Sequence, residues 1–491
     1  MEDNKLYIDV EEKPKKLSEW LLFSLQHILA MLVACITVPL LTGLPIAATI
    51  VSAGIGTLIY VLFTKGKSPV FLSSSFAYIA PISSAMAVGM IGNGTGNNYA
   101  AIMIGMIMVG LIYAIVALVI KFVGTAWISK ILPPIIVGPV IMAIGLSLAG
   151  SAVSNISSAP VSNSPAYNWC ALTSGIVALF ATAFASHYGK KMTKLIPFVI
   201  GMGAGYITAI LFTVFGYYIG GNEYYRVIDF TPLVEIFSAE NISFASFFNY
   251  KLFVPNDPES FIFLRFNELS RFDWAQIGSV ALLFIPVAFV TMCEHIGDHE
   301  NLGNIIGRDL LNGEPGMSRT LAGDGIATAV SGILSGVANT TYGENVAVIG
   351  MTKIASTAVI ISAALMSVAF GFFTPFTALL KTIPSCVTGG VSLILYGFIA
   401  SSGIKMLIKE KIDLTNTKNI FIASVILVSG IGGLIFKFGN PDKPAITITS
   451  IAVAMFLGII LNLVLVEKKD KKTKVKEVEV KEETASIEET K

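Results

Sequence analysis

Between Glu19 and Glu223 the sequence contains no aspartate or glutamate, and none occurs again between Glu344 and Glu410. Several stretches inside these ranges stay apolar for about 20 residues, the length that an α-helix needs to cross the ~30 Å hydrocarbon core of a bilayer. Only 13% of the residues are charged and 54% are hydrophobic, whereas soluble domains have roughly 25% charged residues. These features predict an all-α, polytopic membrane protein.

Hydrophobic runs predict about fourteen transmembrane segments, about seven in residues 20–220 and about seven in residues 274–466, the last of them starting near residue 445. A polar, mildly acidic insert at 221–273 separates the two halves. Residues 1–19 lack the apolar core of a cleavable signal and are predicted to be a cytoplasmic N-terminus. Residues 467–491 are highly charged and are predicted to form a disordered cytoplasmic tail.

Lysines collect in alternate loops of this arrangement, and the loops between them at 43–45, 91–98 and 151–167 carry no lysine or arginine. The lysine-bearing positions are Lys13, Lys15, Lys16, Lys65, Lys67, Lys121, Lys130, Lys190, Lys191, Lys194, Lys405, Lys409 and Lys411. The positive-inside rule assigns these loops to the cytoplasm. We therefore expect a multi-pass protein of the plasma membrane, with both termini in the cytoplasm and the insert outside.

Two short sequence similarities between the halves indicate that they are repeats. Pro133, Gly138 and Val140 recur at the same spacing as Pro384, Gly389 and Val391, and Ser74-Ser75-Phe76-Ala77 resembles Thr340-Thr341-Tyr342-Gly343. An odd number of segments per half would turn the second half upside down, and inverted repeats with interrupted segments are typical of secondary transporters. Matches this short also arise by chance, so the sequence leaves both interpretations open.

The acids at membrane depth are confined to one region: Glu294, Asp298, Asp324 and Glu344. An intramembrane carboxylate costs at least ~2.5 kcal/mol, so its presence favours a function. Glu294 and Asp298 are four residues apart and project from one helix face. Their mutual repulsion is relieved if one of them holds a proton, which predicts proton coupling. The alternative is that Asp298 lies solvated at a helix end without a role.

The stretch from Asn339 to Asn345 is too polar for a continuous lipid-facing helix. We expect an extended piece beside a cavity, with a half-helix from about Asn345, and a counterpart at 73–76. Such backbone suits a planar ligand with amide-like donors and acceptors: Glu294 and Glu344 accept from ring N–H groups, while an aromatic side chain covers the ring. The alternative is that these hydroxyls and aromatics only pack helices together.

Histidine spacing raises the question of a metal. His295 and His299 are four apart, as in zinc helices of the H-E-x-x-H type, but the glutamate is absent from its place and no third ligand is evident. We therefore expect no metal site and no intramembrane metalloprotease. His27 follows Gln26 in an apolar segment, where a packing role and a site-orienting role are both open.

Other motifs exclude further classes. The four cysteines lie far apart in apolar segments and are expected to pack as small core residues. The Gly-x-Gly sequences at 201–203 and 323–325 indicate close helix packing, and no Walker-type motif is present. A net charge of +1 gives no support for nucleic acid binding. Transport would thus draw on an ion gradient, with H⁺ favoured over Na⁺ and no cofactor.

These motifs resemble, in order, those of the nucleobase–ascorbate transporter family, specifically its bacterial uracil/xanthine permease branch. The matching residues are Gln26-His27, Ser74-Ser75-Phe76-Ala77, Glu294-His295-Ile296-Gly297, Gly323-Asp324-Gly325 and Thr340 to Asn345 with Thr352-Lys353. The resemblance covers nearly all of 15–466. It implies a core domain of segments 1–4 and 8–11, a gate domain of segments 5–7 and 12–14, and a homodimer.

The resemblance also implies roles for single residues. Glu294 and Glu344 would hydrogen-bond a nucleobase, and backbone around Ser75, Phe76 and Gly343 would complete the polar contacts beside Tyr342. The residues implied in proton coupling or support of the site are Asp298, Asp324, His27, His295, Asn345 and Gln26.

Two departures from the family pattern bear on the substrate. Uracil permeases commonly have a histidine at the position of Asp298, whereas xanthine-type members have an aspartate there, as this chain does. In addition, Ala347 stands where the family usually has a glycine. Glu344, where many purine carriers have glutamine, favours uracil. We expect a nucleobase:proton symporter that imports uracil, with a xanthine or other purine permease as the alternative. A membrane enzyme or passive channel is the alternative from a different class.

Overall fold

The computed structural model describes residues 6–86, 98–125, 127–158, 167–190, 193, 196–238, 244–440 and 443–465. Helices dominate this part of the chain, and eight of the described helices are long and apolar enough to cross a membrane. These are Leu17–Thr42, Ile46–Phe63, Tyr99–Val123, Pro134–Ile156, Trp169–Tyr188, Pro197–Ile219, Trp274–Ile306 and Ser385–Lys409. The predicted polytopic helical class is confirmed, while the count of about fourteen crossings stays a prediction. The predicted tail at 467–491 lies outside the described residues.

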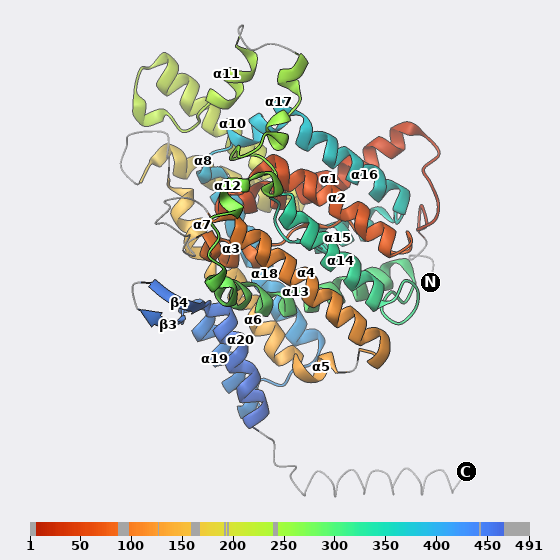
Figure 1. The fold of residues 1–491 in the computed structure, drawn as a ribbon. Helices are drawn as coiled ribbons and strands as arrows, with labels where there is room; N and C mark the ends of the chain where they lie inside the picture. The colour runs from red at the N-terminus through yellow and green to blue at the C-terminus, as the bar shows by residue number, and fades with distance from the viewer. Residues whose placement is uncertain are drawn as a thin grey trace, which may run out of the picture.

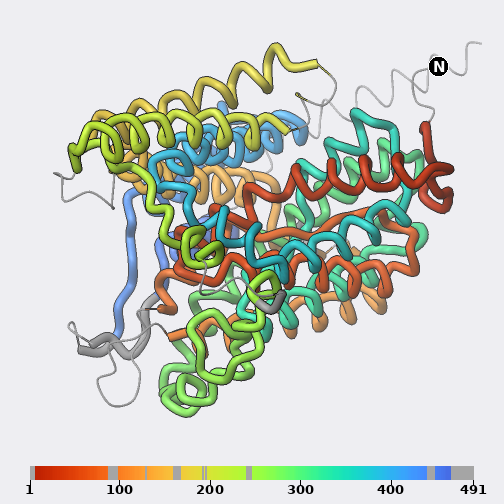
Figure 2. Tube along the Cα trace, turned by 90° about the horizontal axis from the view of Figure 1, so that it is seen from above, coloured from red at the N-terminus to blue at the C-terminus, as the bar shows by residue number. Residues whose placement is uncertain are grey.

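One group of helices packs around two short strands. Its members are α1 (Leu17–Thr42), α2 (Ile46–Phe63), η1 (Phe76–Tyr78), α3 (Ile79–Met86), α4 (Tyr99–Val123), α13 (Ile277–Ile306), α14 (Met317–Ile333), α15 (Gly343–Thr352) and α16 (Thr357–Phe372). Helix α14 packs against α4 and α2, and α16 packs against α2 and α1. Figure 2 shows this group as the red, orange and teal bundle.

A second group lies beside the first. Its members are α6 (Pro134–Ser147), α7 (Ala149–Ile156), α8 (Trp169–Tyr188), α10 (Pro197–Leu211) with its π-helical continuation η2 (Phe212–Ile219), α18 (Ser385–Lys409), α19 (Thr417–Ile431) and α20 (Ser450–Val464). Helix α18 is central, because it packs against α6, α7 and α8, while α19 joins α6 to α20. Two short helices, α5 (Ile128–Ile131) and α17 (Thr374–Lys381), complete the connections.

The two extended stretches predicted from the sequence are present and pair with each other. Strand β1 (Ser73–Ser74) runs antiparallel to β2 (Asn339–Thr340). The Ser75 N–H donates to the Ala338 carbonyl over 3.0 Å and extends the pairing. Both strands are buried, so each satisfies backbone groups that no water could reach. Helix α15 begins two residues before the expected Asn345, because Tyr342 is the last residue in extended conformation.

The described residues of the insert, 221–238 and 244–273, are folded into short helices. These are η3 (Glu223–Tyr225), α11 (Thr231–Phe237), η4 (Phe244–Phe247), η5 (Tyr250–Phe253), η6 (Ile262–Leu264), α12 (Phe266–Leu269) and, at its end, η7 (Trp274–Gln276). Arg265 anchors it: this buried side chain donates to the Ser260 carbonyl over 3.0 Å and lies 4.1 Å from the Tyr99 ring. The insert is thus attached to α4 of the first group.

The predicted start of the last transmembrane segment was wrong. Residues expected to begin a helix near 445 instead form β4 (Lys443–Ile448), which pairs antiparallel with β3 (Phe436–Asn440). Figure 1 shows this hairpin at the edge of the molecule beside α19 and α20. The alternation of isoleucine and threonine at 446–449 favours a strand, since β-branched side chains fit a pleated sheet. Hydropathy alone did not separate this run from the helix that follows it.

Glycines permit close contact between helices, as the Gly-x-Gly pattern at 323–325 predicted. A Cβ atom added to Gly110 on α4 would lie 2.5 Å from the Gly325 carbonyl oxygen and 2.7 Å from the Ala329 Cβ on α14. At 201–203 the pattern holds for one glycine of the two: a Cβ added to Gly201 would lie 2.6 Å from the Ala178 carbonyl oxygen, whereas a Cβ at Gly203 on α10 would meet no atom within 4 Å. The α4–α14 contact therefore depends on Gly110.

We expect Gly110→Ala to lower the thermal unfolding temperature in detergent, because overpacking of a close contact costs about 1–3 kcal/mol. Gly203→Ala is the matched control and should leave that temperature unchanged or slightly raised, since alanine is the better helix former. Equal melting temperatures for the two variants would show that α4 and α14 separate without cost.

Candidate functional site

A cavity of about 470 Å³ lies between the two helix groups. The first group contributes the segments 75–77 and 340–344 and one side of α13. The second group contributes Ile141 and Ile144 of α6 and a stripe of α18. Polar backbone and acids therefore form one wall of the cavity, and mostly apolar side chains form the other.

Three of the predicted acids line this one cavity: Glu294, Asp298 and Glu344. Glu294 and Asp298 lie one turn apart on α13, as their spacing indicated. The Thr341 hydroxyl donates to Asp298 over 2.8 Å, which ties α13 to the segment after β2. The structure thus brings the acids of two sequence regions into a common chamber.

Glu344 lies in the first turn of α15. The first N–H groups of a helix lack partners within the helix, and its dipole favours negative charge there. A carboxylate and a set of backbone donors therefore sit together where β2 ends. A Cβ added to Gly343 would lie 3.4 Å from the Asp298 carboxylate, so Gly343 and Asp298 are neighbours in the cavity wall.

The predicted aromatic and hydroxyl residues also line the cavity: Ser75, Phe76 and Tyr342. All three are buried. Phe76 meets Tyr396 of α18 edge-on, with ring centroids 6.4 Å apart. An aromatic contact beside the cavity therefore joins the two helix groups.

Gln26, His27 and Asn345 are placed behind the cavity rather than in its described lining. All three are buried. The Nδ1 atom of His27 lies 2.8 Å from Oδ1 of Asn345 and so joins α1 to α15. His27 and Asn345 thus position the helix that carries Glu344.

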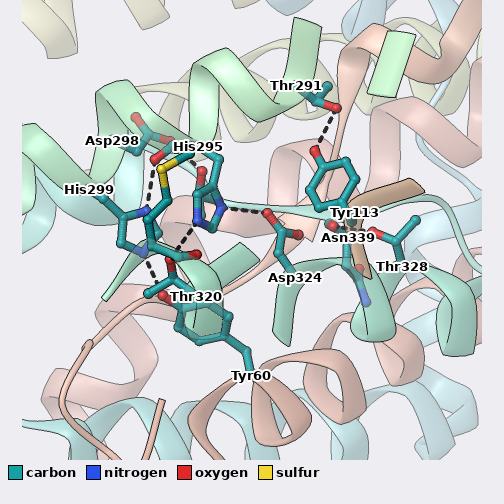
Figure 3. Close-up of polar contacts among 12 residues, drawn as sticks. Tyr60, Tyr113, Thr291, His295, Asp298, His299, Thr320, Asp324, Thr328 and Asn339 are labelled. Carbon is teal, nitrogen blue, oxygen red and sulfur yellow. Dashed lines mark hydrogen bonds and ion pairs between the residues drawn. The ribbon is translucent and has the colours of Figure 1, made fainter. Parts of the chain in front are cut away.

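His295 and Asp324 are also buried away from the described lining. Nδ1 of His295 lies 2.7 Å from Asp324 on α14, and Nε2 lies 3.0 Å from the Thr320 hydroxyl. His299 faces Tyr60 and the backbone of His295 (Figure 3). The ring nitrogens of His295 and His299 are therefore all engaged in hydrogen bonds. Among the described residues, no three His, Cys, Asp or Glu side chains are grouped to hold a metal.

Sequence reasoning missed the wall formed by the second group. On α18 the lining residues Leu395, Phe398, Ile399, Ser402 and Met406 follow helical spacing. Lys405, which the sequence placed in a loop, belongs to α18 and lines the open end of the cavity. The only signal in the sequence was a lysine among apolar residues at helical spacing. This local pattern does not show which helices face α18 across the cavity.

Comparison with known proteins identifies the family. The model of a family described as the permease family matches residues 18–438. The uracil permease of Bacillus caldolyticus is 38% identical over 463 residues, which are 94% of this chain and 95% of that protein. The uracil permease of Bacillus subtilis strain 168 is 37% identical and covers 97% and 99%, and that of Escherichia coli K12 is 32% identical and covers 93% of each chain.

Solved structures share the fold. The transmembrane domain of the cyanobacterial bicarbonate transporter BicA superposes with a TM-score of 0.59 at 12% identity, covering 93% of this chain and all of that domain. The murine solute carrier 26 family member A9 anion transporter, in its inward-facing state, superposes with a TM-score of 0.62 at 11% identity, covering 92% and 69%. The family resemblance deduced from the motifs is confirmed: the chain belongs to the permease family and is a transporter, not an enzyme.

Proposed function

We propose that this protein imports uracil together with a proton by alternating access. The observation that carries the proposal is the common cavity, in which Glu294, Asp298 and Glu344 face the backbone beside two short strands. The relatives named uracil permease, which match over nearly the whole chain, support the choice of substrate.

The cavity suits a flat ring with N–H and C=O groups at its edge. A carboxylate of Glu294 or Glu344 accepts from ring N–H groups, and backbone N–H groups at the start of α15 donate to ring carbonyls. Phe76 and Tyr342 supply aromatic surfaces for the ring faces. The ligand would thus be held by the first helix group alone.

The second helix group forms the movable wall in this proposal. The proposed core domain comprises segments 1–4 and 8–11, and the gate domain comprises segments 5–7 and 12–14. Among the described residues, one ion pair crosses between them: Lys409 of α18 lies 2.7 Å from Glu300 of α13. Relative movement of the two groups would break this pair and expose the cavity to the opposite side.

The open end of the cavity lies among the exposed α18 residues Ser401, Ser402 and Lys405. We infer that this end faces the cytoplasm. Ion pairs connect neighbouring loops here: Lys67 pairs with Glu314, and Arg308 pairs with Asp9. Lysine-rich loops on one side support cytoplasmic termini in a plasma membrane protein.

An inverted repeat fits this architecture. Pro133 and Pro384, which the sequence aligned, each immediately precede a helix of the second group. The interrupted segments β1 and β2 pair antiparallel, as two segments of opposite direction must. Assembly as a homodimer is part of the proposal through the family resemblance.

A second substrate remains a candidate because of Asp298. This acid lines the cavity at the position where the family's uracil permeases commonly have histidine. An additional carboxylate there would suit the extra ring N–H groups of xanthine.

We expect Glu294→Gln and Glu344→Ala each to reduce radiolabelled uracil uptake into proteoliposomes by at least about tenfold, because a hydrogen bond to a charged group contributes about 1.5–3 kcal/mol. Glu410→Gln, an exposed acid at the end of α18, is the control and should transport normally. Unchanged uptake in both cavity variants would remove the proposed binding site.

Competition distinguishes the two substrates. We expect unlabelled uracil to suppress uptake of labelled uracil at much lower concentrations than unlabelled xanthine does. Equal or stronger suppression by xanthine would make the protein a purine carrier and assign the discrimination to Asp298.

The coupling ion is identified by the ion gradient that drives accumulation of uracil. An inward proton gradient should drive uracil above its external concentration, and a protonophore should abolish the accumulation. A sodium gradient at equal pH should have no effect. Accumulation driven by sodium alone would replace the proton in the proposal, and uptake without accumulation would indicate a channel.

A further inference from the structure

A second polar cluster lies on a different side of α13 from the cavity acids. His295 joins Asp324 of α14 over 2.7 Å and Thr320 over 3.0 Å. The side chains of His295 and Asp324 are completely buried. A buried ionisable pair in a membrane segment is costly and favours a function, and the cavity described above does not use this pair.

The orientation of the Thr320 hydroxyl is linked to the number of protons that the His295–Asp324 pair holds. The Thr320 hydroxyl donates to the Met317 carbonyl over 3.1 Å, so it has no hydrogen left for His295. Nε2 of His295 must therefore carry a proton and donate it to Thr320. A second proton must lie between Nδ1 and Asp324, because two lone pairs would repel at 2.7 Å. When the Thr320 hydroxyl points to Met317, the pair therefore carries two protons.

The other oxygen of Asp324 indicates where the second proton lies. Among the described residues, Oδ1 of Asp324 is buried without a hydrogen-bond partner. An unpaired oxygen is far less costly on a neutral carboxylic acid than on a carboxylate. Asp324 as the acid therefore donates from Oδ2 to Nδ1 of His295, and the pair is neutral.

Loss of one proton needs only one hydroxyl rotation. When the Nε2 proton leaves, the proton of Asp324 passes to Nδ1, and Asp324 becomes a carboxylate that accepts from Nδ1–H. Thr320 then turns its hydrogen from Met317 to the bare Nε2. No heavy atom has to move, and both histidine nitrogens remain paired.

The groups around His295 disfavour two positive charges at this place. The His299 ring is stacked on it, with centroids 4.0 Å apart. His299 donates from Nδ1 to the His295 carbonyl over 2.8 Å, and its Nε2 lies 2.6 Å from the Tyr60 hydroxyl. Asp298 is engaged by Thr341 in the cavity. Two stacked imidazolium rings would repel each other strongly, so His295 and His299 are not both positively charged.

A separate cavity lies beside this cluster. It has a volume of about 330 Å³ and is lined by His299 together with Glu300, Asn304, Arg308 and Asp309. Glu300, Asn304 and Asp309 are exposed. The His299 ring thus separates this cavity from the ring of His295.

We propose that the His295–Asp324 pair carries the coupled proton, separate from the substrate cavity, and that the Thr320 hydroxyl reverses its hydrogen bond when that proton leaves Nε2 of His295. The inference rests on the proposed proton symport. It assigns substrate and proton to different sides of the same helix.

Asp324→Asn tests the proposal in proteoliposomes, because the asparagine amide donates to Nδ1 of His295 as the carboxylic acid does but cannot release a proton. Exchange of labelled for unlabelled uracil at equal pH needs no net proton release and should continue close to the wild-type rate. Accumulation driven by a proton gradient should be lost. Thr320→Ser keeps the hydroxyl and should retain both activities, whereas Thr320→Val should lose accumulation.

The outcomes separate this proposal from the proposed function. Accumulation by Asp324→Asn at the wild-type level would overturn the assignment of the proton while leaving symport intact. Loss of exchange together with accumulation, in variants that elute as wild type on size exclusion, would make the pair part of substrate binding and overturn its separate role. If Asp324→Asn does not fold, normal accumulation by Thr320→Val would overturn the hydroxyl switch. A wild-type protein indifferent to proton gradients would refute symport itself.

Discussion

The architecture depends on the antiparallel pairing of two short strands inside a helical bundle. Backbone that leaves the helix within a membrane must find hydrogen bonds in the protein, since hydrocarbon offers none. Strands β1 and β2 provide them for each other, and the Thr328 hydroxyl adds a bond to the Asn339 carbonyl over 2.5 Å. The interruption also creates the start of α15 in the cavity wall. The same element therefore stabilises the break and presents the binding surface.

The positions of the acids depend on this interruption of the helix. Glu344 lies where the dipole of α15 favours negative charge, and Glu294 and Asp298 face it from α13. The opposite wall, from α6 and α18, contributes no carboxylate to the described lining. An apolar wall can move away from a bound ring without breaking hydrogen bonds, whereas a polar wall could not. This asymmetry lets one helix group hold the ligand while the other opens and closes.

Much of this was accessible from the sequence, and the exceptions have physical reasons. Hydropathy predicted the helices, and the polar run from Asn339 predicted the strands, because both signals are local. The hairpin of β3 and β4 was missed because the mean hydropathy of this run does not distinguish it from the transmembrane helix that follows. The α18 wall and the role of Lys405 within it were missed because contact between distant helices leaves no local trace. For the same reason the sequence grouped Asp324 with the cavity acids, although its partner is His295.

Helix α13 carries both polar clusters on different faces. Residues 294 and 298 point to the substrate cavity, while 295 and 299, one position further on, point toward α14 and α2. A step of about 100° per residue is enough to separate the faces, because an α-helix has 3.6 residues per turn. Sites on adjacent residues of one rigid helix need no shared atom to be coupled, since any tilt or rotation that alters one environment alters the other. Such coupling is reciprocal by thermodynamic necessity: if a bound ring stabilises one orientation of α13, and that orientation favours the protonated pair, then the proton strengthens binding of the ring by the same factor.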